Sequence, residues 1–296
     1  MPMSSVEEPG RSRGQKPTGL IRRYPASAFF AITFIVSWAA ALGVAWPWIR
    51  RGQSLPNLAG ILMFPAMLLG PSVTGVLMTR VVAGPAGLRA LADRLGRWSL
   101  GKWYATLLIP PVLVYGTLAS LQHLASAAFA PNLFFWGVLF GVPAGYLEEI
   151  GWMGFAYDRL RKQSSALGAA VVLGVLWAAW HLPVVDFLGA AHPHGSYWLP
   201  FFLAFATAMI AMRVLISWVY VNSGSILATQ LLHMTSTGAL VVFSAPRIGP
   251  GQEAAWYGLY ALALWLVVAA VVQVYGPALE RPQPSPGVAL GQGRHR

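Results

Sequence analysis

Long apolar runs recur along this 296-residue chain and restrict it to few architectures. About eight of them approach or exceed the roughly 20 apolar residues that an α-helix needs to cross a bilayer. Inside a bilayer the backbone must satisfy its own hydrogen bonds, so such runs form helices. The sequence therefore predicts an all-α, polytopic membrane protein with about eight transmembrane helices. The expected spans are residues 27–49, 58–78, 103–129, 133–155, 166–183, 197–220, 226–243 and 255–274.

Polar segments flank this membrane domain, which we expect to occupy residues 26–275. Residues 1–25 and 276–296 are predicted to be disordered, because polar or Pro/Gly-rich segments bury too little apolar surface to fold. With eight spans, nearly all basic loop residues fall on the side of both termini, and only Arg50, Arg51 and Arg247 fall on the other. The positive-inside rule then predicts cytoplasmic termini, in what we expect to be a bacterial cell membrane.

The net charge of +11 raises the question of nucleic-acid binding. The basic residues lie in short loops between apolar runs, not in stripes interleaved with aromatics of the kind that bind single strands. We therefore expect the lipid bilayer as a partner and no nucleic acid. The absence of cysteine excludes disulfides, thiolate nucleophiles and cysteine metal sites.

Two adjacent carboxylates, Glu148 and Glu149, lie inside the fourth expected span. A charge at bilayer depth costs at least about 2.5 kcal/mol, so an intramembrane carboxylate indicates function by default. The chain has only nine acidic residues, and most of the others lie in tails or loops. The pair therefore becomes the first candidate for the functional site.

Two other spans carry histidine: the fifth ends near His181, and the seventh contains His233. Residues four apart share a helix face, so we expect Trp177 to stack over His181 and Thr237 to lie beside His233. Polar groups on membrane helices turn inward, which predicts that Glu148, His181 and His233 converge in one wet cavity. Straight spanning helices would hold the three at different depths, so this convergence requires tilted or broken helices.

Two chemistries suit such a cavity. In the first, a glutamate and a histidine take a proton from water while the second histidine and a hydroxyl stabilise an oxyanion. In the second, Glu148, His181 and His233 ligate zinc or another divalent metal, which lowers the pKa of a bound water to about 7. The local spacing favours no metal, because no H-E-x-x-H motif is present.

The three motifs resemble those of the CPBP intramembrane proteases, a family that includes the CAAX prenyl endopeptidases and the Abi-like bacteriocin-processing and immunity proteins. That family carries E-E-x-x-x-R, F-x-x-x-H and H-x-x-x-N on successive helices. The corresponding segments here are Glu148 to Met153, Trp177 to His181 and His233 to Thr237. The resemblance extends over roughly residues 26–274.

The resemblance implies an endopeptidase without a covalent acyl intermediate, acting on a peptide or membrane-protein substrate. It implies that Glu148, Glu149, His181 and His233 are catalytic, with Glu148 and His181 activating water. His233 would hold the oxyanion, supported by Thr237 and Trp177. Family members have been described both as metalloproteases and as glutamate-type proteases.

Trp177 stands where the family motif has phenylalanine, and two further departures concern the polar residues. Met153 replaces the arginine, so Glu149 needs another partner or stays protonated, and Thr237 replaces the asparagine. Arg213 lies near the inner end of the sixth span, where we expect it to snorkel to the headgroups. The alternatives to a protease are a proton-coupled transporter and a non-proteolytic immunity or scaffold protein. The sequence leaves the substrate open, including prenylated proteins and bacteriocins.

Overall fold

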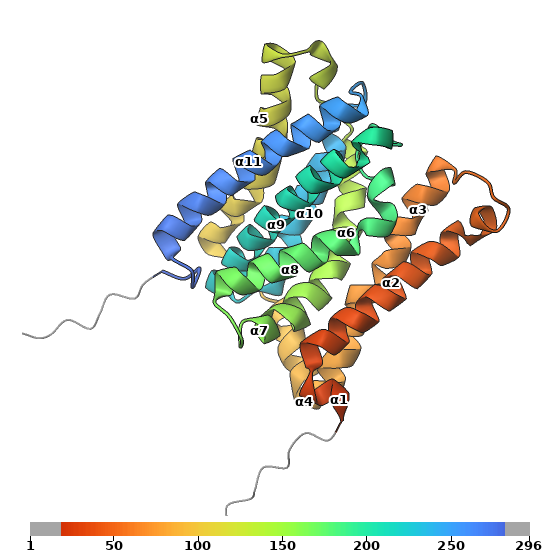
Figure 1. Ribbon diagram of the computed structural model, residues 1–296. Coiled ribbons are helices and arrows are strands. Elements are labelled where there is room, and N and C mark those ends of the chain that lie inside the picture. The colour runs from red at the N-terminus through yellow and green to blue at the C-terminus, as the bar shows by residue number, and fades with distance from the viewer. Residues whose placement is uncertain (1–18, 282–296) are drawn as a thin grey trace, which may run out of the picture.

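A computed structural model describes residues 19–281 of the protein, and all its regular structure in that range is helical (Figure 1). The long helical segments are α2 (Pro25–Ile49), α4 (Leu69–Leu95), α5 (Ile109–Leu124) together with the turn η1 that precedes it, α9 (Trp198–Ser223) and α11 (Pro250–Tyr275). The shorter helices and turns are α1 (Leu20–Arg23), α3 (Asn57–Met67), η1 (Gly101–Leu108), η2 (Ala127–Phe129), η3 (Phe135–Gly137), α6 (Val138–Gly151), η4 (Trp152–Ala156), α7 (Tyr157–Leu160), α8 (Ala166–Trp180), η5 (Leu182–Phe187), η6 (Gly195–Tyr197) and α10 (Ile226–Val242).

The prediction of an all-α, polytopic membrane protein is confirmed. In the described part of the chain, five helical segments are long and apolar enough to cross a membrane: Pro25–Ile49, Asn57–Leu95, Gly101–Leu124, Gly195–Ser223 and Pro250–Tyr275. The other three expected spans coincide with α6 continued by η4, with α8 and with α10, and the α-helices themselves have 14, 15 and 17 residues. These three short helices are the ones that carry Glu148, His181 and His233.

The short helices lie in the middle of the bundle. In Figure 1, α2 and α3 form one flank, and α5 and α11 form the other. Helix α6 packs between α4 and α10, and α8 packs on α9. Because α8 has fewer residues than a span requires, it ends inside the protein and places His181 at its C-terminal cap. The broken helix that the convergence of the site required is therefore present.

Glycines on α6 set the close approach of α10. A Cβ added to Gly145 would lie 2.6 Å from both the Gln230 carbonyl oxygen and the Met234 backbone nitrogen, closer than Cβ atoms pack in proteins. The Gln230 side chain also donates a hydrogen bond to the Tyr146 carbonyl, at 2.7 Å. Small residues are the usual means of close packing between membrane helices. Here they bring the helix of His233 against the helix of Glu149.

A five-residue π-helical turn, η4 (Trp152–Ala156), follows α6 directly. Such turns insert an extra residue into a helix and are frequent at functional sites. All five residues of η4 are buried, and it begins four positions after Glu148. The sequence did not predict this turn.

The tails predicted to be disordered lie largely outside the described residues, since residues 1–18 and 282–296 are not described. Within the described part, Leu20–Arg23 form the single helical turn α1. Near the other end of the chain, the Pro277 carbonyl accepts a hydrogen bond from the Leu167 backbone nitrogen, at 3.0 Å. The start of the C-terminal segment, at Pro277, is therefore packed on the helix bundle.

Candidate active site

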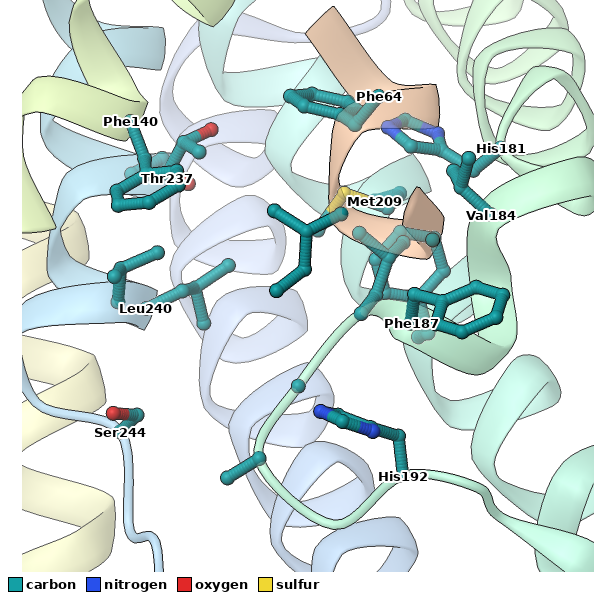
Figure 2. Close-up of a pocket in the computed structure, with 18 of the residues that line it drawn as sticks. Phe64, Phe140, His181, Val184, Phe187, His192, Met209, Thr237, Leu240 and Ser244 are labelled. Carbon is teal, nitrogen blue, oxygen red and sulfur yellow. The ribbon is translucent and has the colours of Figure 1, made fainter. Parts of the chain in front are cut away.

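A cavity of about 470 Å³ contains the three residues that the sequence predicted to converge. Glu148, His181 and His233 all line it, together with Trp177 and Thr237. Figure 2 shows His181 beside Phe64 on one side of the cavity, with Thr237 and Phe140 on the opposite side. The three residues thus line one cavity, as the sequence predicted. They come from α6, α8 and α10, which are distant from one another along the chain.

The Glu148 carboxylate is fully buried, and one of its oxygens is held by two tryptophans. Its Oε2 accepts hydrogen bonds from the indole nitrogens of Trp152, at 3.0 Å, and Trp177, at 2.7 Å. Its Oε1 has no hydrogen-bond partner among the described residues. A buried oxygen without a partner costs about 1–3 kcal/mol, and more when charged. The cavity side of Glu148 is therefore ready to accept a hydrogen bond from water or substrate.

The Glu149 carboxylate is equally buried but has no free oxygen. Arg213 Nη1 donates to both Oε1 and Oε2, each at 2.8 Å. His233 Nδ1 lies 2.8 Å from Glu149 Oε1. A carboxylate that pairs with arginine accepts hydrogen bonds, so Nδ1 of His233 is the protonated nitrogen. Glu149 thus fixes the orientation of His233 and leaves its Nε2 without a protein partner among the residues described.

This geometry corrects two expectations. Arg213 does not snorkel to the headgroups: its side chain is fully buried, and its guanidinium carbon lies 4.1 Å from the centre of the Trp177 ring. Glu149 does not lack an arginine partner, because Arg213 on α9 takes the place that Met153 leaves vacant on the helix of Glu149 itself. The position of Arg213 near the end of its span suggests snorkelling, but an ion pair with Glu149 satisfies the guanidinium inside the protein instead. An arginine inside a span needs a partner, and that rule indicates a buried carboxylate for Arg213 without specifying which one.

His181 is held by its own helix. Its Nδ1 lies 2.8 Å from the Trp177 carbonyl oxygen one turn earlier. A carbonyl only accepts, so Nδ1 carries the proton, and in the neutral ring Nε2 keeps its lone pair. Phe64 stacks on the imidazole with ring centres 6.1 Å apart, and Phe205 contacts its edge at 5.3 Å. The expected contact between Trp177 and His181 is present, with an edge-to-face geometry and ring centres 5.5 Å apart.

Trp177 connects all parts of the site. Its indole donates to Glu148, its carbonyl accepts from His181, and its ring contacts His233 with centres 5.1 Å apart. Thr237, one turn beyond His233, lines the cavity and is half-buried. Trp152 was not singled out from the sequence as a site residue, although it lies four positions after Glu148, where a helix face predicts contact.

A second cluster of titratable groups lies at the end of the cavity, where residues 188–194 form a loop. His194 Nδ1 is 3.1 Å from Asp186 Oδ1, and its Nε2 is 3.5 Å from Glu253 Oε2. Glu253 also accepts hydrogen bonds from the backbone nitrogens of Ala190 and Ala191, at 2.8 and 2.7 Å. We call Asp186, His194 and Glu253 the loop cluster, because it fastens this loop to α11.

The two clusters bear on the metal that the sequence predicts as an alternative. Among residues 19–281, no three His, Cys, Asp or Glu side chains are grouped so that they could hold a metal ion. In the active-site cluster, the Nδ1 atoms of His181 and His233 and both oxygens of Glu149 already have protein partners. These contacts leave Glu148 Oε1 and the Nε2 atoms of His181 and His233 without a hydrogen-bond partner among the described residues, so zinc or another divalent metal at this donor set stays a prediction.

Comparison with known proteins agrees with the motif resemblance. Residues 130–239 match the family model of the Rce1-like type II CAAX prenyl endopeptidases. The chain is also 24% identical over 228 residues to the CAAX prenyl protease 2 of Methanococcus maripaludis, a match that covers 71% of this chain and 82% of that protein. These similarities support a membrane-embedded protease. The resemblance to the CAAX prenyl endopeptidases is thus confirmed, and the matched segment contains Glu148, Glu149, His181, His233 and also Arg213.

Proposed function

We propose that this protein is an intramembrane endopeptidase in which Glu148 and His181 activate a water molecule for attack on a peptide bond. The observation that carries the proposal is the asymmetry of the Glu148 carboxylate. Two indoles hold Oε2, while Oε1 has no partner among the described residues in a cavity that also contains His181 and His233. That is the arrangement a general base needs, since it must be held firmly and still reach the proton it abstracts.

The charges of the buried groups suggest which state reacts. Arg213 balances Glu149. The remaining pair is neutral when one proton resides on either Glu148 or His233, and an unbalanced buried charge is costly. With the proton on His233, Glu148 is ionised and basic, and the Nε2–H of His233 can donate to an oxyanion. Glu149 then stabilises the imidazolium through Nδ1.

The reaction proceeds in two proton transfers. Water gives one hydrogen to Glu148 Oε1 and donates the other in a hydrogen bond to His181 Nε2, while its oxygen attacks the carbonyl carbon. His233 and the Thr237 hydroxyl donate to the resulting oxyanion. Glu148 then passes its proton to the amide nitrogen, the C–N bond breaks, and a carboxylic acid and an amine leave. The base contributes roughly 10²–10⁴-fold and an oxyanion donor about 10²–10³-fold.

The rim of the cavity favours a protease over a transporter. Leu62 of α3 and Leu139 and Phe140 of α6 line the cavity and are also exposed at the surface, by 48%, 61% and 46%. In a membrane protein such side chains face lipid. The cavity therefore has a lateral side between α3 and α6 through which a membrane-embedded segment can reach Glu148.

The test compares the new protein termini in membranes from cells that express the wild type or Glu148→Gln. We expect a set of cleavage products that requires Glu148. Glu280→Gln, which changes an exposed carboxylate outside the site, is the matched control and should leave those products in place. Identical products from wild type and Glu148→Gln would contradict the mechanism and favour a non-proteolytic role.

A second measurement separates side-chain catalysis from metal catalysis. We expect purified protein to contain no stoichiometric zinc, and strong chelators to leave turnover unchanged. Zinc in a one-to-one ratio that disappears in His181→Ala would contradict the proposal and establish the metal alternative.

A further inference from the structure

The two ends of the helix bundle differ in charge and in access to the cavity. At one end, the Arg94–Asp158 ion pair at 2.9 Å connects α4 with α7. At the same end, the Asn222 side chain donates to the Leu279 carbonyl at 2.7 Å and connects α9 with the segment after α11. We call it the basic end. At the opposite end, the Asn132 backbone nitrogen donates to the Ser244 carbonyl at 3.0 Å, and Glu253 of α11 accepts hydrogen bonds from the loop after η5. We call it the mouth end.

Basic side chains gather at the basic end. In the described part of the chain the mouth end has three. Arg213 is buried in the active site and belongs to neither end. The positive-inside rule places such a basic end in the cytoplasm. The basic-end residues are Arg22, Arg23, Arg80, Arg89, Arg94, Arg97, Lys102, Arg159, Arg161, Lys162 and Arg281, and those of the mouth end are Arg50, Arg51 and Arg247.

The active-site cavity reaches the mouth end. Its lining includes Ala190 and His192 from the loop after η5, Ser244 after α10, and Glu253 at the start of α11. In Figure 2, His192 and Ser244 lie at one end of the cavity, away from His181 and Phe64. No residue of the connections at the basic end lines it. By helix rise, Glu148 lies about 15 Å along α6 from Val138, the mouth-end start of that helix.

We propose that the active site opens to the non-cytoplasmic side of the membrane and cleaves apolar segments of proteins that have already been translocated. This inference takes the reaction from the proposed function, and it takes the side of the membrane from the distribution of basic residues. The cavity walls near Glu148 are largely apolar and aromatic, with Phe64, Phe140 and Phe187 among them. Because the cavity opens to the non-cytoplasmic side, protein export must supply the substrate. Peptide bonds that stay in the cytoplasm are not cleaved.

The absence of cysteine from the chain makes the side of the cavity directly measurable. Single cysteines are introduced as Ser244→Cys in the cavity, Gln53→Cys in the exposed loop at the mouth end, and Ser164→Cys in the exposed loop at the basic end. Intact cells are treated with a membrane-impermeant maleimide. We expect Ser244→Cys and Gln53→Cys to be labelled, and Ser164→Cys to be labelled only after the cells are permeabilised.

The opposite labelling pattern would overturn the proposal, and so would labelling of Gln53→Cys without Ser244→Cys, because the cavity would then be closed to that side. The Glu148-dependent termini give the second readout. We expect them to map to translocated regions or to the non-cytoplasmic ends of membrane spans, and cytoplasmic sites would contradict the inference. If no Glu148-dependent terminus exists, the proposed function fails, while the labelling still decides to which side the cavity opens.

Discussion

The active-site cluster and the loop cluster are built from the same residue types, and they differ in which atoms remain free. In the loop cluster both oxygens of the Glu253 carboxylate accept backbone hydrogen bonds, and His194 Nδ1 contacts Asp186, while His194 Nε2 lies 3.5 Å from Glu253 without forming a hydrogen bond. In the active-site cluster His181 and His233 each use one nitrogen, and Glu148 uses one oxygen. A carboxylate such as Glu253, whose two oxygens are both hydrogen-bonded, holds structure together, whereas a fixed carboxylate with a free oxygen, such as Glu148, can act on a substrate.

The comparison also separates Glu148 from its neighbour. Glu149 resembles the loop cluster, because Arg213 and His233 occupy both its oxygens. We therefore infer that Glu149 acts through His233 as a positioning residue, and that Glu148 is the group that meets the water. Predictions for the two clusters follow from this difference, and we expect turnover to respond most to Glu148 and least to His194.

The largest loss of turnover is expected for Glu148→Gln. The amide keeps an oxygen that can accept the hydrogen bonds of Trp152 and Trp177 but cannot take a proton from water. We expect kcat to fall by about 10²–10⁴-fold, with the thermal unfolding temperature near that of the wild type. The measurement is turnover of a peptide that contains a Glu148-dependent cleavage site. Glu253→Gln in the loop cluster is the matched control, and an equal loss of kcat there would refute the distinction between the clusters.

The next effect concerns Arg213. Arg213→Met leaves Glu149 as a buried charge without its main partner, which costs about 3–5 kcal/mol in comparable pairs, so we expect a large fall in unfolding temperature together with a loss of turnover. Arg213→Lys is the conservative control: only Nη1 contacts Glu149, and one ammonium group can make that contact. We expect the lysine variant to retain most of the stability.

A double variant tests whether Arg213 replaces the arginine absent at Met153. In Met153→Arg with Arg213→Met, the cation returns to the helix of Glu149, one turn away. We expect turnover to recover in part relative to Arg213→Met alone, reduced by the strain of a larger side chain at a fully buried position. Recovery of unfolding temperature without turnover would show that the pair serves stability only.

A smaller effect is expected for Trp177→Phe. The ring is kept, but the indole N–H that donates to Glu148 at 2.7 Å is lost. A hydrogen bond to a charged group contributes about 1.5–3 kcal/mol, and 1.4 kcal/mol corresponds to about tenfold in rate. We expect kcat to fall about tenfold. Trp180→Phe is the matched control, because its indole nitrogen is buried without a partner among the described residues, and a similar loss there would point to packing.

The sequence predicted the residues of the site better than their connections. Glu148, His181 and His233 were found because polar groups in apolar spans are conspicuous, and each brings its own reason to face inward. The pairing of Glu149 with Arg213 joins residues 64 positions apart, and no local pattern specifies such a contact. The short helices, the π-helical turn and the second hydrogen bond on Glu148 likewise depend on how the glycines let the helices pack.

The smallest effect on turnover is expected for His194→Gln, which removes the imidazole between the two carboxylates of the loop cluster. Both ring nitrogens and the stacking on Phe201, with ring centres 3.8 Å apart, are lost. A buried group deprived of its partner costs about 1–3 kcal/mol, so we expect a lower unfolding temperature and near-normal kcat. His192→Gln changes a residue of the same loop that makes no side-chain hydrogen bond within the described part of the chain, and it should change neither quantity. If His194→Gln abolished turnover at a temperature where the protein remains folded, the loop cluster would belong to the catalytic machinery, and free atoms would no longer distinguish the two clusters.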